Sequence, residues 1–168
     1  MRFKVTIMDE RMTIWGIGPK LAVLSLAYSI IPIVLTSLFP RFFVVSLVPP
    51  YAFRVVGTIL LAIGIPFWAV SAITLKRGFQ AGVLCTKGVY SLVRNPLYSA
   101  LILFIVPGTL MFFRSWILFT IPVAAYFIFS RLIRNEEEWL AKQFGEEYLK
   151  YKARVRSILP VPRLKSRP

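Results

Sequence analysis

Four uncharged runs of residues limit what this sequence can fold into. Charged residues bracket runs of 20, 21, 19 and 16 residues, at 21–40, 55–75, 95–113 and 115–130. A helix that crosses a bilayer needs about 20 apolar residues. The first three runs have this length, and the fourth gains it if the flanking arginines extend their side chains to the interface. We therefore predict four transmembrane helices, the last two forming a tight hairpin around Arg114, at about 20–40, 54–75, 96–113 and 115–131.

The composition agrees with a membrane environment and narrows the possible chemistry. The chain is 57% hydrophobic and 17% charged, whereas soluble domains average about 45–50% apolar and about a quarter charged residues. Buried helices of a soluble protein are therefore a poor alternative. The sequence has no histidine and a single cysteine, Cys85. This excludes histidine-ligated metals, histidine-dependent nucleophiles, intrachain disulfides and multi-cysteine metal sites, so we expect no metal site.

Basic residues are distributed unequally between the two predicted sides of the membrane. Only Arg41, Arg54 and Arg114 fall on one side, and the other 18 of the 21 Lys and Arg lie on the side of both termini. The positive-inside rule then places both termini in the cytoplasm. The first residues lack an apolar segment with a cleavage site, so we expect no signal peptide. The net charge of +14 indicates anionic membrane lipids as partners. Because the basic residues flank spans, we expect no nucleic-acid partner.

Each predicted span contains an internal proline. These are Pro32, Pro66, Pro107 and Pro122. A proline in a membrane helix frees a carbonyl and tends to kink the helix, which can open space inside a bundle. The alternative is a proline that the span merely tolerates, and the sequence leaves both open.

Apolar residues near the C-terminus recur with helical spacing. They fall 3 or 4 residues apart, at Leu140, Phe144, Tyr148, Tyr151 and Val155. This spacing puts them on one face of a helix, although Gly145 could break it. We therefore predict an all-α, polytopic membrane protein with about four transmembrane helices and a cytoplasmic, amphipathic C-terminal helix.

Glu137 lies in the centre of this apolar stripe. At 100° per residue the stripe is centred on Glu137, with Glu136 at its edge. A carboxylate on a packed face needs a cation, strong donors or water, or else it becomes protonated. A salt bridge to a nearby arginine is one interpretation, and binding of a ligand's cationic centre is the other. Arg94 could serve as the partner of Glu137 or of an anionic substrate.

The third span is predicted to begin at Asn95 and Pro96. Asparagine is a favourable N-cap and proline is favourable in the first turn. Helix capping is therefore the simplest role for Asn95.

Three polar segments carry motifs, at 86–90 (TKGVY), 93–98 (VRNPLY) and 136–151 (EEEWLAKQFGEEYLKY). Together they resemble the isoprenylcysteine carboxyl methyltransferase family and its phospholipid methyltransferase relatives. The first two look like the family's T-x-G-x-Y and R-H-P-x-Y motifs, and the third looks like its Glu-Glu helix. The resemblance covers residues 86–160, and residues 1–75 match only as apolar spans. We expect residues 1–168 to form a single membrane-embedded domain.

The resemblance implies an integral membrane enzyme that uses S-adenosylmethionine. It implies methyl transfer to a lipophilic or small anionic acceptor, with an isoprenylcysteine-type carboxylate favoured. The implied cofactor-binding residues are Tyr90, Asn95, Pro96, Tyr98, Glu136 and Glu137. The implied catalytic residues, which would hold a substrate carboxylate or phosphate, are Arg94 and Arg154.

The chain departs from the family pattern at Asn95, where the motif has histidine. Asparagine can exchange hydrogen bonds but cannot accept a proton at neutral pH. A carboxylate or thiolate acceptor is already a nucleophile, whereas an amine must first lose a proton. The substitution therefore favours an anionic acceptor. Two alternatives stay open: a non-catalytic lipid-binding or scaffold protein that keeps the fold, and a sterol-reductase-like enzyme with a nicotinamide site.

Overall fold

The computed structural model describes residues 16–159, and every regular element in this range is a helix. The N-terminal half contains α1 (Gly18–Leu38), α2 (Pro40–Phe43) and α3 (Pro50–Ala81). The rest contains α4 (Val89–Leu92), α5 (Pro96–Ala100), the π-helical turn η1 (Leu101–Ile105), α6 (Val106–Met111), the 3-10 turn η2 (Trp116–Phe119) and α7 (Thr120–Arg154). The predicted all-α class is confirmed.

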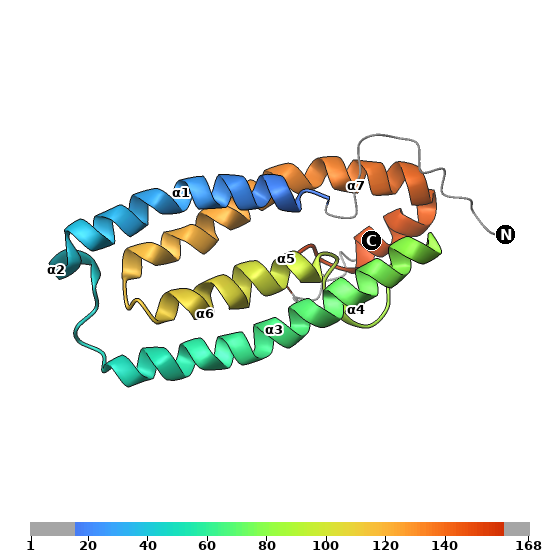
Figure 1. Cartoon of the computed structure of the whole chain (residues 1–168). Coiled ribbons are helices and arrows are strands. Elements are labelled where there is room, and N and C mark those ends of the chain that lie inside the picture. The colour runs from blue at the N-terminus through green and yellow to red at the C-terminus, as the bar shows by residue number, and fades with distance from the viewer. Residues whose placement is uncertain (1–15, 160–168) are drawn as a thin grey trace, which may run out of the picture.

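The helices form an elongated bundle whose long axes run side by side (Figure 1). α1 packs mainly on α7, and α3 packs mainly on the α5–η1–α6 segment. The beginning of α1, the end of α3, α4 and the C-terminal part of α7 gather at one end of the bundle. All three motif segments therefore lie at the same end.

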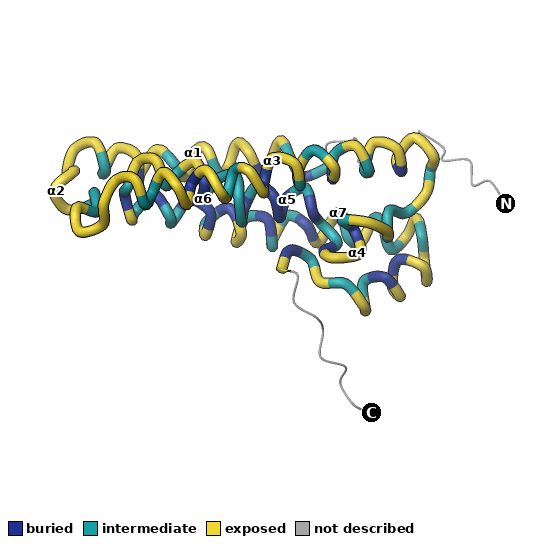
Figure 2. Tube along the Cα trace, turned by 90° about the horizontal axis from the view of Figure 1, so that it is seen from below, coloured by how far each residue is buried: buried dark blue, intermediate teal, exposed yellow. Residues whose placement is uncertain are grey.

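Within residues 16–159, three helical segments have the length and hydropathy to cross a membrane. They are Gly18–Leu38, Pro50–Ala81 and Trp116–Arg154. The remaining predicted span, 96–113, is a shorter apolar helix, Pro96–Met111. Large apolar side chains on the outer faces, such as Leu26 on α1 and Ile59 on α3, are more than half exposed (Figure 2). This surface suits lipid contact, and the chain is an integral membrane protein.

The C-terminal helix was predicted as a separate element, but it continues the last span. α7 runs without interruption from Thr120 to a break at Gly145, where φ is 53° and ψ is −130°. Arg131, Arg134 and Glu136 are good helix formers, so the helix extends beyond its apolar part. The break that Gly145 was expected to allow is confirmed, because glycine adopts positive φ at little cost.

The prolines have different structural roles. Pro32 and Pro66 lie inside α1 and α3. Pro107 is the second residue after the π-helical turn η1, and such local π-helical adjustments accommodate proline in membrane helices. Pro122 lies in the first turn of α7, where its missing N–H has no partner to lose. It is therefore not an internal kink of the last span.

A row of small residues lets α3 approach its neighbours closely. Gly57, Gly64, Ser71 and Gly78 are spaced by seven residues and are all buried. A seven-residue spacing keeps them on nearly one face of the helix. A Cβ atom at Gly57 would lie 2.7 Å from the carbonyl oxygen of Gly108 on α6. This seam was not recognised in the sequence, and it brings the third and second spans into backbone contact.

The seam gives a direct test of the bundle. We expect Gly57→Leu to cost about 1–3 kcal/mol, since the side chain meets a backbone carbonyl that cannot move away. Ala62→Leu on the exposed face of α3 is the matched control and should change stability little. Thermal unfolding in detergent measures both. Equal melting temperatures for the two variants would contradict the close packing of α3 against α6.

Candidate functional site

The chain folds back on itself after Gly145. Beyond this break, Tyr148 and Tyr151 are almost fully buried, with 2% and 4% exposure. The Tyr151 hydroxyl donates a hydrogen bond of 2.5 Å to the carbonyl of Tyr90 in α4. The C-terminal part of α7 is thereby held against the loop that precedes the third span.

The segment after α7 then runs beside the first residues of the third span. The backbone N–H groups of Arg94 and Asn95 donate to the carbonyls of Arg156 and Ser157, at 2.8 and 3.0 Å. The Ser99 hydroxyl donates to the carbonyl of Ile158 at 3.0 Å. These contacts unite the two motif regions, which are about 60 residues apart in the sequence.

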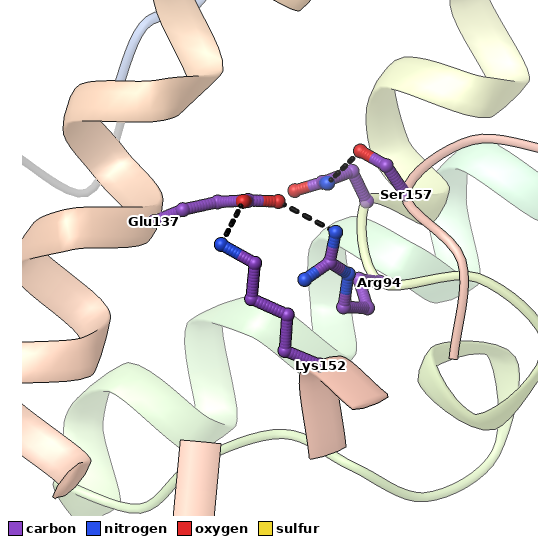
Figure 3. A network of polar contacts seen from close by, with 5 residues as sticks. Arg94, Glu137, Lys152 and Ser157 are labelled. Carbon is purple, nitrogen blue, oxygen red and sulfur yellow. Dashed lines mark hydrogen bonds and ion pairs between the residues drawn. The ribbon is translucent and has the colours of Figure 1, made fainter. Parts of the chain in front are cut away.

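An ion-pair cluster occupies the centre of this junction (Figure 3). Arg94 Nη2 lies 2.7 Å from Glu137 Oε1, and Lys152 Nζ lies 2.7 Å from Glu137 Oε2. The side chains of Arg94 and Glu137 are 7% and 12% exposed, whereas that of Lys152 is 40% exposed. Glu137 thus meets the expected arginine, and it also binds a lysine that the sequence did not indicate.

The guanidinium group of Arg94 has buried donors that do not contact Glu137. Its Nε and Nη1 atoms are buried and have no hydrogen-bond partner among the described residues. A buried guanidinium with unpaired donors is costly unless another group satisfies them. Arg94 can therefore hold Glu137 with one nitrogen and an anionic ligand with the others.

Asn95 occupies the N-cap position of α5, as predicted, but its side chain does not cap the helix. Its Nδ2 atom instead donates to Ser157 Oγ at 2.9 Å (Figure 3). Its backbone carbonyl accepts a hydrogen bond from the Ser99 hydroxyl at 3.0 Å. The family's histidine position is thus used here to fix the C-terminal segment, and Pro96 beside it is buried.

Glu136 on α7 and Tyr98 on α5 both lie beside the beginning of α1. The Ile17 N–H donates to Glu136 Oε2 at 3.4 Å, and a Cβ atom at Gly16 would lie 2.7 Å from the same oxygen. Burial raises the pKa of Glu136 above its usual range, against the smaller opposing effect of the Ile17 N–H. Tyr98 packs its ring on Phe129, with centroids 5.3 Å apart.

The remaining predicted site residues lie further out. Tyr90 is buried and its hydroxyl donates to the carbonyl of Ser71 at 3.4 Å. Arg154 is exposed, and its Nε donates to the carbonyl of Lys150 at 3.3 Å. The structure therefore brings together Arg94, Asn95 and Glu137, and it separates them from Arg154.

A groove of about 370 Å³ opens beside the ion-pair cluster. One wall is α7 and the other is the chain after it. Its apolar lining comprises Tyr126, Phe129, Ile133, Ile158 and Leu159, and its polar lining comprises Arg94, Ser130, Arg134, Glu137, Arg156 and Ser157. Sequence reasoning missed Arg134, Arg156 and Ser157. Arg134 lies one helical turn before Glu137, which is a signal that could have identified it.

Comparison with known proteins supports one family. The model of the phospholipid methyltransferase family matches residues 51–147. A probable protein-S-isoprenylcysteine O-methyltransferase of Oryza sativa subsp. indica is 30% identical over 114 residues, which cover 62% of this chain and 60% of the relative. Protein-S-isoprenylcysteine O-methyltransferase B of Arabidopsis thaliana is 32% identical over 77 residues, covering 46% of this chain and 39% of the relative.

The similarity extends to a fungal relative. Protein-S-isoprenylcysteine O-methyltransferase of Schizosaccharomyces pombe is 32% identical over 94 residues, covering 54% of this chain and 39% of that protein. The alignments thus span between about two fifths and three fifths of these relatives' lengths. No solved structure matches the chain.

The ion-pair cluster predicts unequal effects of its two cationic contacts. Glu137→Gln leaves the buried Arg94 uncompensated, so we expect a loss of about 3 kcal/mol. Lys152→Gln should cost less than about 1 kcal/mol, because this lysine is partly exposed and the Arg94–Glu137 pair survives. Thermal unfolding in detergent compares the two. A loss as large for Lys152→Gln as for Glu137→Gln would contradict the central role of the buried pair.

Removing the charge of Glu136 should stabilise the protein, whereas removing that of Glu137 should destabilise it. The pKa of Glu136 is raised in the folded state, so ionisation of this residue opposes folding. Its contribution to stability is fully present below the unfolded-state pKa and is lost as the pH rises through the folded-state pKa. Glu136→Gln can still accept the Ile17 N–H, and we expect it to raise the melting temperature at neutral pH by about 2–4 °C. The gain should shrink on acidification. The exposed Glu138→Gln is the control, and a lower melting temperature for Glu136→Gln at neutral pH would contradict this assignment.

Proposed function

Because the chain belongs to the phospholipid methyltransferase family, we propose that it transfers a methyl group from S-adenosylmethionine to a lipophilic anionic acceptor. An isoprenylcysteine-type carboxylate is the favoured acceptor, as the names of the relatives suggest. The observation that carries this proposal is the buried Arg94, which lines the groove and whose Nε and Nη1 have no hydrogen-bond partner within residues 16–159. Such donors suit a carboxylate or phosphate.

The residues at the junction suit the proposed cofactor. Its methionine part carries an ammonium group, for which Glu137 offers carboxylate oxygens. Lys152 now contacts one of these oxygens and is 40% exposed, so its side chain can give way. Asn95 and Pro96 directly follow Arg94 in the chain, and Tyr90, Tyr98 and Glu136 belong to α4, α5 and α7, which meet at the same end of the bundle. When bound, the cofactor supplies a methyl group on a positively charged sulfur.

The chain's own groups fit a reaction that needs orientation more than proton transfer. A carboxylate acceptor is already a nucleophile, so Asn95 need not act as a base. Arg94 can align the acceptor with its free donors, and burial of this residue strengthens the interaction. We propose that Arg94 binds the acceptor directly. Arg154, which is exposed and outside the groove, would contribute only if its side chain turned inward.

A second candidate function rests on Asn95. Its hydrogen bond to Ser157 is a structural use of the position where the family motif has histidine. A non-catalytic lipid-binding protein could keep the fold and this contact. Turnover by the wild-type chain decides between the two.

The methyltransferase proposal predicts donor binding and a specific product. Purified protein in detergent should bind labelled S-adenosylmethionine, and Glu137→Gln should weaken this binding at least tenfold, whereas the exposed Lys142→Gln should not. Folded protein is selected by gel filtration, because Glu137→Gln also affects stability. Membranes that contain the wild-type chain should acquire a labelled methyl group that mild base releases as methanol, which identifies an ester.

Several outcomes would contradict the proposal. Wild-type protein that binds no donor contradicts the function, and undiminished binding by Glu137→Gln contradicts the site. A methyl label that resists base contradicts the carboxylate acceptor. An Asn95→His variant that gains turnover while the wild type has none favours the non-catalytic alternative.

A further inference from the structure

The groove beside the ion-pair cluster follows one face of α7. Tyr126, Phe129, Ile133 and Glu137 line it at spacings of three or four residues, so they form a single stripe. The stripe covers about three helical turns, from the apolar part of the span to its charged end. The groove thus offers an apolar wall continuous with the lipid-facing segment and a polar end at the motif junction.

The polar end has an excess of positive charge. Arg94, Arg134 and Arg156 line the groove, and Glu137 is its only acidic lining residue within 16–159. Both oxygens of Glu137 are already paired, with Arg94 and with Lys152. The side chains of Arg134 and Arg156 are exposed, so they are free to meet a ligand. The proposed methyl donor adds further positive charge, since its sulfonium and ammonium groups outnumber its one carboxylate.

We infer that Arg134 and Arg156 are specificity residues that, together with Arg94, select an acceptor whose head group is anionic and carries no ammonium. Its hydrocarbon tail lies along Tyr126, Phe129 and Ile133. A zwitterionic head group would place its ammonium among three guanidinium groups, and these like charges would repel one another. This inference rests on the proposed function and names the acceptor class of the same site. Neither arginine belongs to a motif segment, since Arg134 precedes the Glu-Glu helix motif at 136–151 and Arg156 follows it.

An interfacial anchoring role for these arginines is the competing explanation. Arg131 separates the two, because it is exposed on α7 one turn before Arg134 but does not line the groove. If arginines at this level only attract lipid head groups, Arg131 contributes as much as Arg134. If the groove selects a ligand, only Arg134 and Arg156 contribute.

The test measures binding without methyl transfer. The full chain in a neutral maltoside detergent is titrated, by native mass spectrometry, with oleoyl lysophosphatidic acid and oleoyl lysophosphatidylethanolamine. These probes share the tail and a phosphate, and only the second carries an ethanolamine group with its ammonium. We expect the first to bind at least tenfold more tightly. Arg134→Gln and Arg156→Gln should each weaken its binding about five- to tenfold, and Arg156→Lys should restore part of it. Arg131→Gln should stay within twofold of wild type.

Three results would overturn the inference. These are equal affinity for the two probes, an equal loss in Arg131→Gln, and an affinity for inorganic phosphate equal to that for oleoyl lysophosphatidic acid, which would show that the tail contributes nothing. The substituted arginines are exposed, so melting temperatures close to wild type are expected and confirm folding. Donor binding on the same samples separates the two proposals. Donor binding without probe selectivity contradicts only this inference, and probe selectivity without donor binding contradicts only the methyltransferase function.

Discussion

The ion pair between Arg94 and Glu137 is the interaction on which the functional end of this molecule depends. Arg94 comes just before the third span, and Glu137 lies on α7 beyond the apolar part of the last span. Removing two charges from water is costly unless their geometry is good and their remaining donors are satisfied. The pair meets the first condition at 2.7 Å, but two donors of Arg94 are left over. These unpaired donors are the physical basis for the proposal that the site binds an anionic ligand.

The membrane-embedded part of the fold brings these residues together. The buried row from Gly57 to Gly78 allows α3 to approach the α5–η1–α6 segment at backbone distance. Inside lipid, helices are not driven together by the hydrophobic effect, so close packing of small residues holds the spans together. The break at Gly145 then returns the chain to the same end, where Tyr151 and Ser99 fix it by hydrogen bonds to backbone carbonyls. Rigid spans therefore position the site, and a folded-back tail closes one wall of its groove.

The sequence was informative wherever a local rule determines the outcome. The lengths of the uncharged runs identified the spans. Helical periodicity placed Glu137 on a packed face, and Gly145 marked the position where this helix could break. Sequence reasoning failed where contacts depend on the direction that the chain takes after Gly145. The turn at Gly145 determines that Lys152 reaches Glu137 and that Ser157 reaches Asn95, and a 3.6-residue period carries no information on either. The third span ends at Met111, two residues before its predicted end, because the length of an uncharged run does not show where a helix ends.

The absence of histidine acquires a structural meaning at Asn95. A histidine at this position could exchange protons near pH 7, whereas asparagine can only donate and accept hydrogen bonds. Here its amide joins the start of the third span to the segment that carries Arg156. Asn95 thus holds Ser157, which lines the groove, and offers no proton acceptor there. The proposed methyl transfer would therefore begin from an acceptor that is already ionised, and the three arginines that line the groove would favour such an acceptor.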